Sequence, residues 1–131
     1  MNKINKTDKE WKELLDSQTY SVTRKSATEP PFTGKYLNVK SKGVYCCICC
    51  GNELFSSESK FNSNSGWPSF FEAINDKNVT EIIDNSHNMI RTEVVCTSCD
   101  SHLGHVFNDG PNPSGLRYCI NSVSLKLKKI D

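Results

Sequence analysis

The sequence lacks the features of membrane-inserted, exported and nucleic-acid-binding proteins. No stretch approaches the roughly 18 apolar residues of a membrane-spanning helix, and residues 1–30 contain no apolar signal segment. The formal net charge is only +1, which gives no large positive field to attract nucleic acid. We therefore expect a cytoplasmic protein with neither a membrane nor a nucleic-acid partner.

The chain is also too short for several domains. Its 131 residues are 36% hydrophobic and 24% charged, as in soluble globular proteins. A domain of this size buries roughly two-thirds of the surface of its unfolded chain. We expect a single domain over residues 1–131, acting as a monomer.

Few segments have a helical pattern. Thr7 and Glu10 have the spacing of a capping box, and Trp11, Leu14 and Leu15 form one apolar stripe behind it. Two prolines interrupt regular structure within residues 28–34. One or two helices are therefore expected before residue 28.

The remainder has the pattern of a β protein. Turn-forming residues recur at short intervals, and strand patterns outnumber helical ones. The sequence predicts a mainly β fold with an antiparallel sheet behind the N-terminal helices. The strands are expected at residues 43–46, 79–83, 89–95 and 116–127, with turns at 84–88 and 107–115 and a polar loop at 62–66.

Cysteine is the abundant residue, with seven in the chain. In a reducing compartment cysteines bind metal or react more often than they form disulfides. Four of them make two Cys-x-x-Cys pairs, Cys47 with Cys50 and Cys96 with Cys99. Two such pairs far apart in sequence are typical of a structural zinc site with four thiolate ligands.

The first pair has a competing register, because Cys46 and Cys49 have the same spacing. A zinc knuckle favours a residue that tolerates positive φ after its second cysteine. Gly51 and Asp100 occupy that position in the chosen register. A site of Cys96 and Cys99 with both nearby histidines is a third option, but its two-residue gap is short and it leaves the first pair unused. Reduced core cysteines without metal remain the structural alternative.

Cys119 stands alone, between Arg117 and Asn121. Side chains alternate along a strand, so all three are expected on one face. A guanidinium beside a thiol favours the reactive thiolate, and an asparagine can donate to the sulfur or to a substrate. An isolated strand cysteine is often inert core filling. An apolar core, however, would not place arginine and asparagine there without partners.

Two histidines and a tryptophan are further candidates. His102 and His105 titrate near neutral pH, which suits proton delivery. Trp67 follows the polar loop at residues 62–66 and could form a partly exposed platform. Each of these residues, taken alone, is more often structural than functional.

Five motifs in order give the chain its clearest resemblance. They are Thr28-Glu29-Pro30 with Phe32-Thr33-Gly34, Cys47-x-x-Cys50-Gly51, Gly66-Trp67-Pro68-Ser69-Phe70, His102-Leu103-Gly104-His105-Val106-Phe107 and Arg117-Tyr118-Cys119-Ile120-Asn121-Ser122. The chain resembles the B-type methionine-R-sulfoxide reductases over about residues 7–127. The resemblance implies two antiparallel sheets with short N-terminal helices (the β-tent, two-knuckle type) and zinc at an apex away from the active site.

The resemblance also implies an activity and its residues. The activity is reduction of methionine-R-sulfoxide in peptides and proteins, with Cys119 attacking the sulfoxide sulfur and becoming a sulfenic acid. His102, His105 and Asn121 would organise water and proton transfer. Trp67 would contact the ε-methyl group of the substrate.

One position departs from the family pattern. Many members have a resolving cysteine two residues before this tryptophan, whereas this chain has Ser65. The sequence therefore favours an external reductant: a thioredoxin-like or glutaredoxin-like protein, or a small thiol. Two other functions remain open, namely a non-catalytic zinc-binding interaction module of the same fold and a different thiol enzyme using Cys46 and Cys49.

Overall fold

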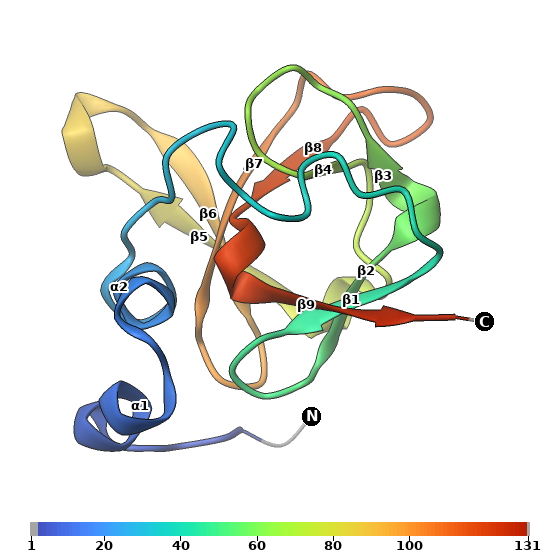
Figure 1. Ribbon diagram of the computed structural model, residues 1–131. Coiled ribbons are helices and arrows are strands. Elements are labelled where there is room, and N and C mark those ends of the chain that lie inside the picture. Colours follow the sequence, from blue (N-terminus) through green and yellow to red (C-terminus); the bar gives the residue numbers. More distant parts are fainter. Residues whose placement is uncertain (1–2, 131) are drawn as a thin grey trace.

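The computed structural model describes residues 3–130, apart from the side chain of His87 (Figure 1). Two short helices come first, α1 (Asp8–Leu14) and α2 (Ser17–Lys25). After α2 the regular structure is mainly strand. In chain order the strands are β1 (Gly43–Cys47), β2 (Glu53–Ser56), β3 (Lys60–Phe61), β4 (Ser69–Phe70), β5 (Val79–Asp84), β6 (Arg91–Cys96), β7 (His102–Phe107), β8 (Arg117–Ile120) and β9 (Leu125–Lys129).

The strands form two antiparallel sheets. One has the order β2-β1-β9, and the other has the order β3-β4-β8-β7-β6-β5. The predicted mainly β fold with two antiparallel sheets and N-terminal helices is confirmed. No helix among the described residues is both long and apolar enough to traverse a bilayer.

Local side-chain contacts begin both helices. At α1 the Thr7 hydroxyl accepts from the Glu10 amide at 3.2 Å, and the Glu10 carboxylate accepts from the Thr7 amide at 3.0 Å. This is the predicted capping box. At α2 the Asp16 carboxylate accepts from the Thr19 amide at 2.8 Å. The predicted stripe on α1 is only partly right, since Trp11 is buried but Leu14 is 65% exposed.

The predicted final strand over residues 116–127 is wrong. β8 ends at Ile120, and a 3-10 turn, η4 (Ser122–Ser124), separates it from β9, which belongs to the other sheet. The Ser124 hydroxyl donates to the His102 carbonyl at 3.0 Å, which holds this crossing in the interior. Val123 therefore does not continue the strand face that carries Cys119.

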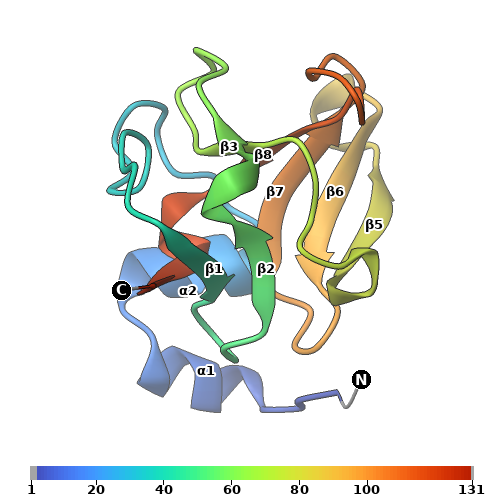
Figure 2. The ribbon, with the colours of Figure 1, turned by 90° about the vertical axis from the view of Figure 1, so that its right-hand side faces the viewer.

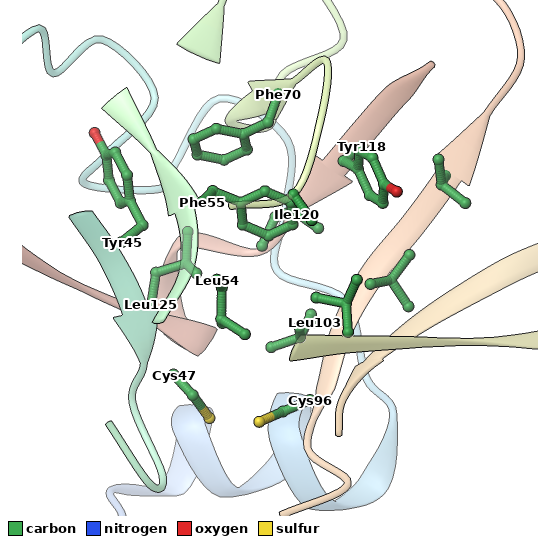
Figure 3. Close-up of a cluster of buried hydrophobic side chains, with 14 of the residues drawn as sticks. Tyr45, Cys47, Leu54, Phe55, Phe70, Cys96, Leu103, Tyr118, Ile120 and Leu125 are labelled. Carbon is green, nitrogen blue, oxygen red and sulfur yellow. The ribbon is translucent and has the colours of Figure 1, made fainter. Parts of the chain in front are cut away.

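The core fills the space between the two sheets (Figure 3). Phe55 stacks on Phe70 with ring centroids 4.5 Å apart, and Tyr118 packs against Phe55 at 5.4 Å. Cys47 and Cys96 lie at one end of this cluster, and Phe70 and Tyr118 lie at the other. Both cysteines border the turns that close β1–β2 and β6–β7. These two turns lie side by side at the lower end of the two sheets in both ribbon views (Figures 1 and 2).

Candidate active site and four-cysteine cluster

Four cysteines meet where the β1–β2 and β6–β7 turns lie side by side. The sulfur atoms of Cys47, Cys50, Cys96 and Cys99 all lie within 4.8 Å of one another. The Cys47–Cys99 and Cys50–Cys96 sulfur distances are both 3.6 Å. A tetrahedral zinc ion with Zn–S bonds of about 2.3 Å needs sulfur atoms roughly 3.8 Å apart. The cluster therefore fits such an ion with only small movements of the sulfur atoms.

The backbone and the electrostatics of the cluster also suit a cation. Gly51 and Asp100 both have positive φ, 80° and 62°, as the knuckle pattern predicted. Their amides donate to the Cys47 and Cys96 carbonyls, closing each turn. Hydrogen bonds among the cysteines lower the pKa of Cys96 and Cys99 and raise the pKa of Cys47 and Cys50. A bound cation would hold all four as thiolates.

The competing ligand sets are not assembled. The Cys46 sulfur lies 3.8 Å from the Val44 carbonyl oxygen, and Cys46 and Cys49 are both outside the four-sulfur cluster. His102 Nδ1 is bonded to Glu93, and His105 Nε2 is bonded to Asp84. Neither histidine is therefore a partner of the cysteine cluster.

Cys119 lies on β8, with β4 on one side and β7 on the other. Ser69 and His105 are its register partners on those two strands. The Arg117 guanidinium donates to the Cys119 sulfur at 2.8 Å, and the Ser69 hydroxyl lies 3.7 Å from that sulfur. The sulfur is also 3.5 Å from the hydroxyl of Ser65. Within residues 3–130 its hydrogen-bonding neighbours are therefore one cation and two hydroxyl groups, and no other thiol.

The sulfur borders a small cavity of about 140 Å³. The lining residues come from β6, β7, β8 and three segments outside the strands: Thr28, Trp67, Arg91, Gly104, His105, Phe107, Arg117, Cys119 and Asn121. Five of the six residues predicted for the active site thus meet at one cavity. His102, the sixth, lies behind His105, with ring centroids 5.5 Å apart.

Arg117 is held rigidly beside the sulfur. Asp109 accepts two hydrogen bonds from its guanidinium, at 2.8 and 3.1 Å, and the Phe107 ring lies 4.5 Å beneath it. The hydrogen bond with Asp109 raises the pKa of Arg117, and the same contact lowers the pKa of Asp109. The positive charge is therefore permanent and its position is fixed.

Asn121 and Trp67 are both anchored to the segment around Glu29. The Asn121 side chain accepts from the Glu29 amide at 3.0 Å and donates to the Leu103 carbonyl at 3.0 Å. The Trp67 indole donates to the Glu29 carbonyl at 3.0 Å. The Glu29 carboxylate in turn accepts from the Val123 amide at 3.0 Å, and burial raises the pKa of this glutamate. Much of the hydrogen-bonding capacity of Asn121 is therefore used by the backbone.

Each histidine is paired with a carboxylate from another strand of the same sheet. His102 Nδ1 is 2.6 Å from Glu93, and His105 Nε2 is 2.8 Å from Asp84. Burial lowers the pKa of His102, although the Glu93 carboxylate opposes this effect. The hydrogen bond with His105 lowers the pKa of Asp84, so this carboxylate stays ionised in the neutral range.

Sequence reasoning missed these carboxylates. Asp84 was expected in a turn and Glu93 on an ordinary strand, and Asp109 was expected in a long turn segment. Cross-strand register, which no sequence motif records, places Glu93 opposite His105 and Asp84 opposite Arg91. The predicted strands at residues 79–83 and 89–95, with a turn between them, were the signal that could have paired these two strands.

Comparison with known proteins agrees with this geometry. A family model described as SelR domain matches residues 15–129, and the chain belongs to this family. The chain is 58% identical over 128 residues to the peptide methionine sulfoxide reductase MsrB of Acinetobacter baylyi, across 98% of this chain and 92% of that protein. It is 58% identical over 124 residues to the protein of the same name from Herminiimonas arsenicoxydans, across 95% and 90%. The resemblance to the B-type methionine sulfoxide reductases is thereby confirmed, and with it the assignment to the oxidoreductases.

Proposed function

We propose that this chain reduces methionine-R-sulfoxide in peptides and proteins to methionine, with Cys119 as the nucleophile. The observation that carries the proposal is the Cys119 sulfur, 2.8 Å from a fixed guanidinium, at a cavity that Trp67 and His105 also line. The relatives named as peptide methionine sulfoxide reductases support the substrate class.

The chemistry needs a soft nucleophile and an acid. The Cys119 thiolate, favoured by Arg117, attacks the sulfoxide sulfur, and the cavity supplies a proton to the sulfoxide oxygen as the S–O bond breaks. Loss of this oxygen as water leaves a sulfonium joined to Cys119 by an S–S bond. Water then attacks the Cys119 sulfur, methionine leaves with both electrons of the S–S bond, and Cys119 becomes a sulfenic acid. His105 and Asn121 line the cavity along this path, with His105 as the proton donor and His102 behind it.

Trp67 is proposed to select the substrate. Its indole N–H is bonded to the Glu29 carbonyl, so the orientation of the ring is fixed at the cavity wall. An apolar ring suits the ε-methyl group of methionine sulfoxide, while Arg117 and His105 face the oxygen. A fixed apolar wall opposite a polar wall distinguishes the two sulfoxide epimers, because only one can satisfy both walls at once.

We propose zinc as the ion of the four-cysteine cluster, one per chain, with a structural role. Four thiolates leave no open coordination position for a substrate. The cluster binds the β1–β2 turn to the β6–β7 turn and so joins the two sheets at one end of the core. Cys119 needs no contact with the ion for its chemistry.

The oxidised enzyme is proposed to be regenerated by an external thiol. Two equivalents of thiol reduce the sulfenic acid, giving the Cys119 thiol, one disulfide and water. Ser65 cannot supply an internal thiol, although it lies 3.5 Å from the Cys119 sulfur. A thioredoxin-like or glutaredoxin-like protein or a small thiol would serve. Cytoplasmic location, monomeric state and a single domain stay predictions.

A turnover assay with separated epimers tests the function. The purified protein is given a peptide with either methionine-R-sulfoxide or methionine-S-sulfoxide, with dithiothreitol as reductant. We expect rapid reduction of the R epimer and at most a trace of reaction with the S epimer. Equal rates would contradict the proposal, and no turnover of either epimer by folded, metal-loaded protein would favour the non-catalytic zinc-binding module.

A further inference from the structure

His105 lies among both positive and negative groups. Arg117 and Cys119 face it from β8, Arg91 and Glu93 from β6, His102 from its own strand and Asp84 from β5. Arg91 and Arg117 line the same cavity, and both oppose a proton on the imidazole. Glu93 is bonded to His102, so it does not pair with His105 directly.

Asp84 is the one carboxylate in contact with His105 in the described part of the chain. The Nε2–Oδ2 distance is 2.8 Å, and the His105 side chain is only 12% exposed. The carboxylate stays in place because it also accepts from the Ser86 amide at 2.9 Å and lies 3.4 Å from the Arg91 guanidinium. The position of the Asp84 carboxylate is therefore fixed by two contacts besides His105.

The contact with Asp84 determines which nitrogen of His105 can donate a proton to the substrate. A carboxylate accepts hydrogen bonds and cannot donate them when ionised, so His105 must carry a proton on Nε2. Nδ1 is then the nitrogen that gains and loses a proton, and within residues 3–130 it has no hydrogen-bond partner. The Asp84 carboxylate also offsets the two guanidinium charges, Arg91 and Arg117, that line the cavity.

We propose that Asp84 is a positioning residue for sulfoxide reduction, which fixes the Nε2–H form of His105 and maintains its protonated ring as the proton donor. The proposal rests on the function proposed above. Asp84 lies behind His105 and acts through it, without touching the substrate.

The test uses two conservative substitutions, of which one removes the negative charge at position 84 and the other keeps it. Asp84→Asn keeps an oxygen that can accept from Nε2 but removes the negative charge, whereas Asp84→Glu keeps the charge. Glu81→Gln is the matched control, because Glu81 is exposed on the same strand and points to the opposite face of the sheet. Each variant is checked for zinc content and thermal unfolding.

The first readout is the rate of a single turnover, with enzyme in excess over the R-epimer peptide and no reductant, across pH 5.5–9. The rate should fall as pH rises, because a proton donor that has lost its proton cannot act. Without the Asp84 charge, this fall in rate should begin at a lower pH. We expect Asp84→Asn to be about 10- to 100-fold slower than wild type at pH 8 but within about threefold at pH 5.5. Asp84→Glu should recover much of the rate at pH 8, and Glu81→Gln should match wild type.

The second readout does not depend on activity. Nitrogen-15 NMR of the histidine rings in the wild-type protein should show the neutral form of His105 protonated on Nε2. A neutral His105 protonated on Nδ1 would overturn the proposal even if the protein proved inactive. If the wild-type protein reduces the R epimer, an equal loss of rate in Asp84→Asn at every pH would also overturn the proposal for Asp84. That result would leave the proposed function intact.

Discussion

The two cysteine-containing regions of this molecule differ in what surrounds the sulfur. The four-cysteine cluster places its sulfurs within 4.8 Å of one another, where each thiolate would repel the next unless a cation lay between them. Cys119 instead has a guanidinium at 2.8 Å and two hydroxyl groups. Its charge is balanced by the protein itself. The first arrangement suits metal binding, and the second leaves a thiolate free to react.

The largest expected effect comes from removing the lone sulfur. Cys119→Ser should lower the rate of R-epimer reduction by more than about 1,000-fold, because a serine hydroxyl is a poor nucleophile here. Thermal unfolding and zinc content should match wild type, since Cys119 is not one of the four clustered cysteines. The measurement is peptide turnover with dithiothreitol, alongside elemental analysis. A Cys119→Ser protein that still turns over would remove the distinction between the two regions.

A substitution in the cluster should give the reverse pattern. Cys96→Ser removes one thiolate ligand, so zinc content should fall well below one per chain. The free energy of unfolding should drop by more than about 4 kcal/mol, as for other losses of a structural metal. Calorimetry and elemental analysis measure the two effects together. A fully folded, zinc-free wild-type protein would contradict the structural role assigned to the cluster.

A gain of function would sharpen the comparison further. In Ser65→Cys the introduced sulfur lies about where the hydroxyl is, 3.5 Å from the Cys119 sulfur, whereas a disulfide bond is roughly 2.05 Å long. A small movement should therefore close an internal disulfide after one turnover, and the sulfenic acid should no longer accumulate. Mass spectrometry of the peptide pair measures this. Ser63→Cys is a control, because Ser63 bonds to Ser65 and Ser69 and makes no contact with Cys119.

The smallest effect is expected at the two cysteines that belong to neither region. Cys46 is buried on β1 beside the Val44 carbonyl, and Cys49 lies beside the cluster without completing it. A Cys46→Ser/Cys49→Ser protein should keep zinc and turn over within about twofold of wild type when dithiothreitol is the reductant. Loss of thiol-driven turnover in a folded, zinc-loaded double variant would assign them a role in recycling.

The sequence allowed the cluster to be predicted more completely than the active site. Local spacing brings both members of each Cys-x-x-Cys pair together, and Gly51 and Asp100 marked the correct register in advance. Trp67, His105, Arg117, Cys119 and Asn121 were also predicted, from family motifs and strand alternation, and the structure brings them to one cavity.

The features that could not be predicted depend on long-range register. The pairing of His105 with Asp84 needs the alignment of β5, β6 and β7, and a one-residue slip would reverse every side chain. α2 was not resolved as a separate helix, because its sequence is rich in hydroxyl and β-branched residues with weak helical preference. The break at η4 was missed since residues 116–127 alternate as one strand would, although the chain crosses between sheets there.

We infer that one cysteine is oxidised during turnover while four bind metal. The most direct test gives zinc-loaded protein one equivalent of R-epimer peptide without reductant, adds a dimedone probe, and maps all seven cysteines by mass spectrometry. We predict one adduct, on Cys119, no disulfide and one zinc retained per chain. Label on Cys46 or Cys49, a disulfide from either to Cys119 at high occupancy, or release of zinc during the turnover would contradict this division of roles.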